Sequence, residues 1–383
     1  MGYSLKLPGR TLFGEGALEE AGADIRALGT RALIVTGRIV QKSEAFARLT
    51  RLLSKQSVGW AVFSDVPGEP DDSMIDEGAR AYGYAGCDFI IGLGGGSPMD
   101  SAKAIAVKVA LPGNVTDWAG REITGKLPPL ALIPTTAGSG SEATRFAVIT
   151  DSKKGAKLLL RGDVLIPSLA VVEHTFTLSA PPALTAYTGI DALTHAVEAY
   201  TSKKATPLTD PYALAAVRRI FESLPKAFKD GSDRAARESM SIAAYEAGVC
   251  ISNASVTLVQ GMSRPIAAKF HVPHGLSNAM LLVHCLRFSA QGRPDKFAKM
   301  ARFIGAAPNR FTDREAADAL IGAFAELTRV LNIPTLRAYG VPENEYREAI
   351  PQMARAAIAS GNPGNTLCDV AEGDIIRLYD SLY

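Results

Sequence analysis

Short apolar runs alternate with amphipathic segments over the first half of the chain. The runs are rich in Val, Ile and Leu, as buried strands are, and the segments between them place apolar residues at helical spacing. Alternating strands and helices predict a mostly parallel sheet covered by helices. The expected strands are 31–36, 59–63, 88–92, 129–134 and 169–172, and helical stretches lie at 72–82 and 98–109.

The pattern changes from about residue 181 onward. Long, alanine-rich segments with helical periodicity take over, and no run there has the pattern of a strand. We therefore expect an α/β, Rossmann-like N-terminal domain over residues 1–178 and an all-helical domain over residues 179–383. The expected helices of the second domain are 182–201, 211–229, 234–252, 314–331 and 346–359.

Composition narrows the class of protein. The chain has 383 residues, of which 47% are hydrophobic, and 41 basic residues nearly balance 39 acidic ones. A net charge of +2 gives no electrostatic case for a nucleic acid or an anionic membrane as partner. No apolar run is long enough to span a membrane, and the first residues do not resemble a secretory signal. The four cysteines are far apart, which is typical of reduced thiols in a cytoplasmic protein.

A glycine loop follows the expected strand at 88–92. Glycines let the backbone approach a pyrophosphate, and the helix that follows offers N–H donors and the positive end of its dipole. Ser97 is suited to cap that helix, with Pro98 at its first position and Asp100 completing a capping box. The alternative is a tight strand-to-helix turn without a ligand. The loop residues are Gly94, Gly95, Gly96 and Ser97.

A second loop, rich in hydroxyl groups and glycine, follows the strand at 129–134. It contains Thr135, Thr136 and Ser139. Ligands of open α/β sheets bind at the carboxyl ends of the strands, so two such loops in one sheet predict a dinucleotide site.

The end of the first strand bears on the choice of dinucleotide. An acidic residue there would hold the ribose hydroxyls of NAD and repel a 2′-phosphate, but this chain has Gly37 and Arg38. These residues leave room and positive charge for NADP(H), which we favour over NAD(H). The alternative for Arg38 is a solvated surface charge.

Metal-ligand spacing occurs in the second half. Asp191 and His195 are four residues apart in an expected helix, so they share one face, and His274 follows in a Val-Pro-His-Gly segment. One carboxylate and two imidazoles suit Fe(II), Zn(II) or a similar ion. The alternative is that Asp191 and His195 simply belong to an exposed polar face of the helix, since this spacing is common by chance. His271 lies three residues before His274 and is a candidate for the substrate site, or else a loop histidine bonded to backbone.

Four segments, 92–106, 133–144, 181–202 and 261–282, together resemble the iron-containing, or group III, alcohol dehydrogenases, and residues 360–363 resemble that family's C-terminal signature. The resemblance covers essentially the whole chain. It implies a dehydroquinate-synthase-like fold with the active site between the two domains. It also implies NAD or NADP as cofactor, a divalent metal (Fe2+ or Zn2+), a small alcohol or aldehyde as substrate, and at least a homodimer.

The resemblance also assigns residues. Asp191, His195 and His274 match three of the family's four metal ligands, but Gln260 stands where the fourth, a histidine, is expected, and Arg264 replaces a histidine found in some members. Gln260 is interpreted as a weak ligand, as a group bonded to a metal-bound water, or as a sign that the metal has been lost. The residues expected to face the cofactor are Ser97, Asp100, Thr135, Thr136, Ser139 and Lys157.

Three functions follow from these patterns. The first is an NAD(P)-dependent alcohol dehydrogenase or aldehyde reductase, in which a divalent metal polarises the substrate oxygen and Asp191, His271 and His274 serve catalysis. The second is a metal-independent reductase of the same fold, similar to maleylacetate reductase, which Gln260 favours. The third is a dinucleotide-binding protein without catalysis.

Overall fold

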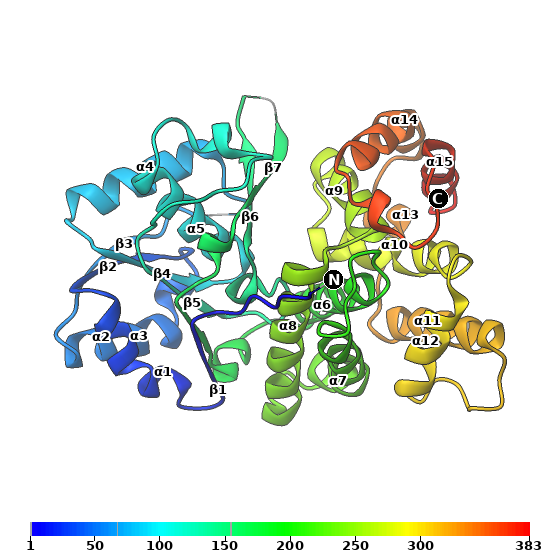
Figure 1. The fold of residues 1–383 in the computed structure, drawn as a ribbon, viewed down its shortest axis with the longest axis horizontal. Helices are drawn as coiled ribbons and strands as arrows, with labels where there is room; N and C mark the ends of the chain where they lie inside the picture. Colours follow the sequence, from blue (N-terminus) through cyan, green and yellow to red (C-terminus); the bar gives the residue numbers. More distant parts are fainter. Residues whose placement is uncertain (1, 67, 154) are drawn as a thin grey trace. The chain divides into compact units, whose positions relative to one another are not determined.

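The computed structural model describes residues 2–66, 68–153 and 155–383. The chain forms two compact units, one of Lys6–Ala180 and the other of Pro181–Tyr383 with a few N-terminal residues. We refer to them as the sheet unit and the helical unit (Figure 1).

The sheet unit contains a parallel sheet of six strands in the order β1-β8-β5-β4-β2-β3. Its strands are β1 (Arg10–Phe13), β2 (Arg31–Val35), β3 (Gly59–Phe63), β4 (Phe89–Gly94), β5 (Leu130–Pro134) and β8 (Leu169–Val172), and its helices are α1 (Ala17–Glu20), α2 (Gly22–Leu28), α3 (Glu44–Lys55), α4 (Asp72–Tyr84) and α5 (Gly96–Ala110). An antiparallel hairpin, β6 (Phe146–Asp151) and β7 (Ala156–Arg161), lies outside this sheet.

Alternation of side chains along the strands produces two separate cores. Leu33 and Val35 of β2 pack with α4, α5 and the hairpin, whereas Ala32 and Ile34 pack with α1, α2 and α3 on the opposite face. Both faces are therefore covered by helices, as parallel sheets require (Figure 1). The sheet also explains the near-continuous apolar runs in the sequence, because each strand is buried on both sides.

The helical unit has no strand among its described residues. Its helices are α6 (Pro182–Tyr200), α7 (Asp210–Lys229), α8 (Arg234–Ala254), α9 (Leu258–Phe270), α10 (His274–Ser289), α11 (Pro294–Phe303), α12 (Asp313–Val330), α13 (Leu336–Tyr339), α14 (Glu343–Ala359) and α15 (Glu372–Asp380). Helix α6 packs against α7, α8, α9 and α10 and is buried along nearly all of its second half. Because α6 is central, its polar residues lie inside the unit rather than on its surface.

The predicted fold class is confirmed: a parallel α/β unit is followed by a helical one. Strand β1 and the β6–β7 hairpin were not predicted, because these half-exposed strands lack a continuous apolar run. The predicted capping of α5 is wrong. The helix begins at Gly96 with Gly95 as its N-cap, no side chain caps it, and Asp100 instead accepts hydrogen bonds from Ser141 Oγ and the Val148 amide.

In the described part of the chain, no single helix has the length and apolar composition needed to cross a membrane. The bent pair formed by α8 and α9 passes the same test of length and composition when its two helices are taken together.

Candidate active site

The two glycine- and hydroxyl-rich loops lie beside each other in the sheet unit. Strands β4 and β5 are hydrogen-bonded neighbours, Gly94 is in register with Pro134, and the Thr135 amide donates to the Gly94 carbonyl at 2.9 Å. A Cβ on Gly95 would lie 3.3 Å from Thr136 Oγ1, and one on Gly96 would lie 3.1 Å from the Ser139 Cβ. The two loops therefore form one surface at the carboxyl ends of the strands.

The conformation of Gly94 and the uncapped start of α5 make this surface suited to an anion. Gly94 has φ of 152°, a conformation that residues with a Cβ rarely adopt, and a Cβ there would lie 2.7 Å from the Pro98 ring. Because no side chain caps α5, its first amides have no side-chain acceptor. Exposed N–H groups at the positive end of a helix are suited to a phosphate.

A network of buried charged side chains joins the second loop to α5. Lys103 is fully buried in α5, and its Nζ donates to the carbonyls of Ser141, Thr144 and Phe146 at 2.7–2.8 Å. Burial lowers the pKa of Lys103 to about 8, although the nearby Asp100 and Glu142 carboxylates act against this shift. The network fixes the end of the loop to the helix that starts at the glycines.

Asp100 belongs to this network. Burial raises the pKa of its carboxyl, against the effects of Lys103, Ser141 and Val148. One of its oxygens accepts from Ser141 Oγ at 2.7 Å and the other from the Val148 amide at 2.9 Å. The contact with the cofactor expected for Asp100 stays a prediction, because in this structure both oxygens hold the protein together.

Arg38 and Lys157 are engaged in ion pairs. Arg38 pairs with Asp65, which follows β3, and Gly37 forms a bridge with the same residue. Both side chains of the Arg38 pair are more than half exposed, so the pair contributes little to stability and a stronger anion can displace it. Lys157 on β7 donates to Glu69 at 2.6 Å. The predicted contacts of Gly37, Arg38 and Lys157 with the cofactor remain predictions.

Helix α6 carries the first two of the predicted metal ligands, Asp191 and His195. Asp191 and His195 lie one turn apart, and Asp191 Oδ1 is 3.5 Å from His195 Nε2. Both residues are about 7% exposed. Glu198, fully buried, lies near the same end of the helix. Glu198 was not predicted as a site residue, although it lies three residues after His195 and therefore on a neighbouring position of the same helix face.

Glu198 caps α9. Its carboxylate accepts from the Thr257 amide at 2.9 Å, the Val259 amide at 2.5 Å and the Gln260 amide at 3.3 Å. Burial raises the pKa of Glu198 to about 7, against these hydrogen bonds, which favour the charged form. An acceptor at a helix N-terminus stabilises the first turn, and here that turn carries Gln260.

Helix α10 contributes His274 at its first position. A Cβ on Gly275 would lie 2.3 Å from the Tyr187 carbonyl of α6, so only glycine permits this close approach of the two helices. The Pro-His-Gly segment thus brings His274 to α6, and His274 Nε2 is 3.7 Å from Asp191 Oδ1. Asn278, one turn later, donates to Asp191 Oδ1 at 2.7 Å.

Gln260 connects these side chains. Its Nε2 donates to Asp191 Oδ1 at 2.9 Å, and its Oε1 lies 3.0 Å from His274 Nε2. Burial alone would raise the pKa of Asp191, but His195, His274 and the two amide donors bring it below its usual value. We call Asp191, His195, Gln260, His274 and Asn278 the polar cluster.

The structure therefore brings together all four residues that the sequence predicted as metal ligands, and it adds Asn278. The separations of 3.5 and 3.7 Å between Asp191 Oδ1 and the two ring nitrogens are close to those between ligands of one ion. However, the same oxygen already accepts two amide N–H groups, and no three acidic, histidine or cysteine side chains among the described residues are arranged to hold a metal. These hydrogen bonds occupy the Asp191 oxygen that faces both rings and the ring nitrogen of His274. The residues as arranged do not fit a metal ion.

Two further residues lie close in sequence to the cluster. His271 is exposed at the C-cap of α9 with φ of 53°, and no hydrogen bond between described residues joins it to the cluster. Arg264 lies one turn after Gln260 on α9. Burial lowers the pKa of Arg264, while the charges of Glu198 and Asp191 oppose that shift. The catalytic role expected for His271 stays a prediction.

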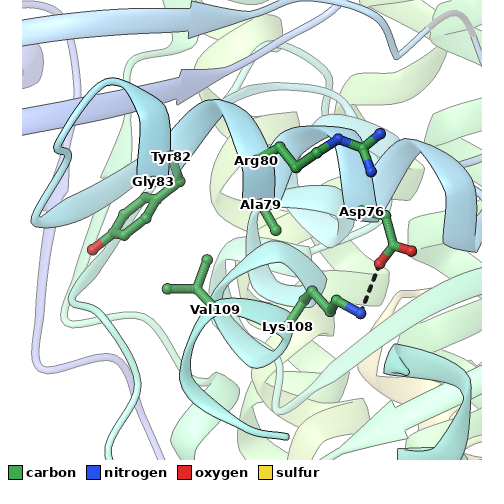
Figure 2. Close-up of a pocket in the computed structure, with 7 residues that line it drawn as sticks. All are labelled: Asp76, Ala79, Arg80, Tyr82, Gly83, Lys108 and Val109. Atoms are coloured by element: carbon green, nitrogen blue, oxygen red, sulfur yellow. Dashed lines mark ion pairs between the residues drawn. The ribbon is translucent and has the colours of Figure 1, made fainter. Parts of the chain in front are cut away.

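A surface hollow of about 480 Å³ lies elsewhere, between α4 and α5 (Figure 2). Lys108 and Asp76 form an ion pair of 3.0 Å across it, and Arg80 and Tyr82 also line it. None of the predicted cofactor, metal or catalytic residues contributes to its walls, so we do not assign the activity to it.

Comparison with known proteins identifies the family. Residues 8–174 match the iron-containing alcohol dehydrogenases, and residues 185–383 match the C-terminal part of the Fe-containing alcohol dehydrogenase family. The chain belongs to this family, and the resemblance found in the sequence is confirmed. Enzymes of the family use a nicotinamide dinucleotide and a divalent metal.

Several relatives match over nearly their full length. The 1,3-propanediol dehydrogenase of Citrobacter freundii is 36% identical, with 94% of this chain and 93% of the relative covered. The NADPH-dependent butanol dehydrogenase of Clostridium saccharobutylicum is 33% identical, with 98% and 97% covered. The NAD-dependent methanol dehydrogenase of Bacillus methanolicus is 32% identical, with 96% and 97% covered. A crystal structure of 1,3-propanediol oxidoreductase superposes with a TM-score of 0.97 at 33% identity over the whole of both chains.

Proposed function

We propose that this protein is an NAD(P)-dependent oxidoreductase that interconverts a small alcohol and its aldehyde or ketone. The observation that carries the proposal is the joint surface of the two loops after β4 and β5, in a chain of this family. In the oxidative direction, hydride leaves the carbinol carbon for the nicotinamide, and the hydroxyl loses its proton to solvent. Alcohol and oxidised cofactor thus give carbonyl compound, reduced cofactor and one proton.

We propose that the dinucleotide binds with its pyrophosphate on Gly94, Gly95, Gly96 and Ser97, at the start of α5. The neighbouring loop would contribute the hydroxyl groups of Thr135, Thr136 and Ser139. Support comes from the adjacency of the loops and from the amides of α5 that no side chain caps.

We propose that the substrate binds at the polar cluster. The His274 side chain is 31% exposed, compared with about 10% for Asp191 and His195, so His274 is the member that a substrate oxygen would meet first. Asp191 would orient the ring through Gln260. His271, exposed three residues earlier, would pass the hydroxyl proton to solvent.

For the choice of dinucleotide we propose NADP(H). A 2′-phosphate would compete with Asp65 for Arg38, and the exposed Arg38–Asp65 pair is weak enough to yield. A phosphate offers the guanidinium two charge-assisted hydrogen bonds, which are stronger than the contact they replace.

We further propose a homo-oligomer, at least a dimer, that acts in the cytoplasm. The described cysteines are all free and three are buried, which suits a reducing compartment. Size-exclusion chromatography with light scattering would test the oligomeric state, and a monomer at micromolar concentration would contradict it.

The decisive experiment for the function is steady-state turnover of purified protein with a panel of short alcohols, diols and aldehydes and with each dinucleotide in turn. We expect hydride transfer with at least one pair, followed at the absorbance of the reduced nicotinamide. Gly95→Val is the matched control, because it blocks the cofactor surface without touching the polar cluster. Tight binding of a dinucleotide without turnover on any substrate would instead favour a non-catalytic binding protein.

A further inference from the structure

The direction of every hydrogen bond at Gln260 is fixed by its partners. Asp191 Oδ1 also accepts from the Asn278 amide at 2.7 Å and, as a carboxylate oxygen, can only accept, so it must face the amide NH2 of Gln260. The amide oxygen must then face His274 Nε2, at 3.0 Å. An oxygen can only accept, and this contact is shorter than the 3.4 Å from the Asn278 amide nitrogen to the same ring nitrogen, so His274 Nε2 carries a hydrogen. The nitrogen that would bind a metal ion therefore has no free lone pair.

The acceptor capacity of Asp191 Oδ1 is also used. It accepts from Gln260 Nε2 at 2.9 Å and from Asn278 Nδ2 at 2.7 Å. An ion at this position would have to displace two buried amide donors, each of which would lose its partner in a place that water reaches poorly. A buried donor left without an acceptor is destabilising, so the ion would bind less tightly here than at a site with free oxygens.

The position of Gln260 is held by the scaffold. Its side chain is 2% exposed, and its backbone amide is bound by Glu198 at the start of α9. The first turn of α9 is therefore fixed by α6, the same helix that carries Asp191. The amide bridge between Asp191 and His274 follows from this packing and does not depend on a mobile side chain.

A guanidinium also lies near the cluster. Arg264 lies one turn after Gln260, and the negative charges that act on it are those of Asp191 and Glu198. No hydrogen bond or ion pair between described residues holds its guanidinium. A divalent cation beside Asp191 would be repelled by this guanidinium, which is charged at any physiological pH.

We propose that this protein carries out its reaction without a bound metal ion, and that the Gln260 amide takes the ion's place as the link between Asp191 and His274. The inference rests on the proposed oxidoreductase function, but it can be measured apart from it. It sets this chain apart from the metal-containing members of its own family.

Metal content is the first test. Wild type and Gln260→His are incubated without oxygen with equimolar Fe(II) or Zn(II), desalted, and analysed for metal per subunit by mass spectrometry. We expect Gln260→His to retain about one ion per subunit, because imidazole supplies the missing donor. Wild type should retain at least about tenfold less metal per subunit. Asp191→Asn in the Gln260→His background should lose the ion again.

Turnover is the second test. Wild-type kcat/KM should be unchanged by preincubation with a strong chelator and by added Fe(II) or Zn(II). A wild-type protein that holds stoichiometric metal, loses activity with the chelator and regains it with the ion would overturn the inference. The inference would also be overturned if wild type and Gln260→His were both free of metal after the incubation, because Gln260 would then not be the residue that excludes the ion.

The two proposals fail in different ways. If no alcohol or aldehyde turns over, the function fails, while the difference in metal content between wild type and Gln260→His still decides the inference. If circular dichroism shows that Gln260→His is misfolded, Gln260→Glu replaces it, because a carboxylate at this position also supplies a metal donor.

Discussion

Replacing Lys103 by methionine should show how firmly the second loop, which follows β5, is attached to α5. The Nζ of Lys103 donates to three main-chain carbonyls, those of Ser141, Thr144 and Phe146, and lies 3.0 Å from Thr144 Oγ1. Methionine fills a similar volume and donates to none of them. Each carbonyl left without a donor costs about 1 kcal/mol or more, so about 3 kcal/mol is lost from these contacts.

The charge of Lys103 contributes a second effect. Asp100 and Glu142 are buried beside it, and removing one partner of a buried ionic group costs about 3–5 kcal/mol. The variant no longer has to bury an ammonium group, which offsets part of this cost. Both carboxyls can also take up a proton, because burial raises the pKa of each. We therefore expect Lys103→Met to lower the free energy of unfolding by about 3–5 kcal/mol in total.

The assay is a urea titration, with dinucleotide affinity measured on the folded protein. Lys108→Met is the matched control, since Lys108 is on the same helix but pairs with the partly exposed Asp76 and donates to one carbonyl, that of Gly113, so the loss should be about 1 kcal/mol. Lys103→Met should also weaken dinucleotide binding, because the second loop loses its attachment to α5. A variant that loses no more stability than the control would refute the reasoning.

Three other predictions concern the sheet unit. Gly95→Val should weaken dinucleotide binding by about tenfold or more, because the side chain fills the space beside Thr136 that the pyrophosphate needs; unchanged affinity in a folded variant would contradict this site. Arg38→Ala should lower kcat/KM for NADP(H) by about tenfold or more and leave that for NAD(H) nearly unchanged, and a clear NAD(H) preference indifferent to the variant would show that Arg38 is only a surface charge. Burial raises the pKa of Glu142 to about 7, so the folded state holds the proton of this carboxyl more strongly than the unfolded state does. The contribution of the bound proton to the free energy of unfolding is fully present below about pH 4.5 and is lost as the pH rises through 7. Glu142→Gln should therefore reduce the fall in stability between pH 5 and 8, measured by urea titration, by on the order of 1 kcal/mol, and equal slopes in both proteins would speak against a buried proton at this site.

Local pattern was enough to predict the fold class. Buried parallel strands such as β2 and β4 are continuous apolar runs, and α6 has no glycine or proline after Gly189 to interrupt it, so these elements are visible one at a time. The hairpin β6–β7 was missed for the same reason: its strands are half exposed and acquire their conformation by pairing with each other. Local features also identified part of the polar cluster, since helical spacing gave Asp191 and His195 and the Pro-His-Gly turn gave His274. Gln260 came from the family resemblance, and Asn278 was not predicted.

The contacts among those residues depended on the tertiary structure. The family resemblance left Gln260 as a ligand, an outer group or a sign of metal loss, and the sequence alone does not say which partners a side-chain amide has. Only the packing of α9 and α10 against α6 places Asp191 on one side of that amide and His274 on the other, and so fixes which end faces each. Asp100 is a similar case. Its spacing suggested a helix cap, but Ser141 and Val148, more than forty residues away along the chain, offer its carboxylate two donors. A sequence determines which polar groups a site has available, whereas their hydrogen bonds depend on distances between elements that no local pattern contains.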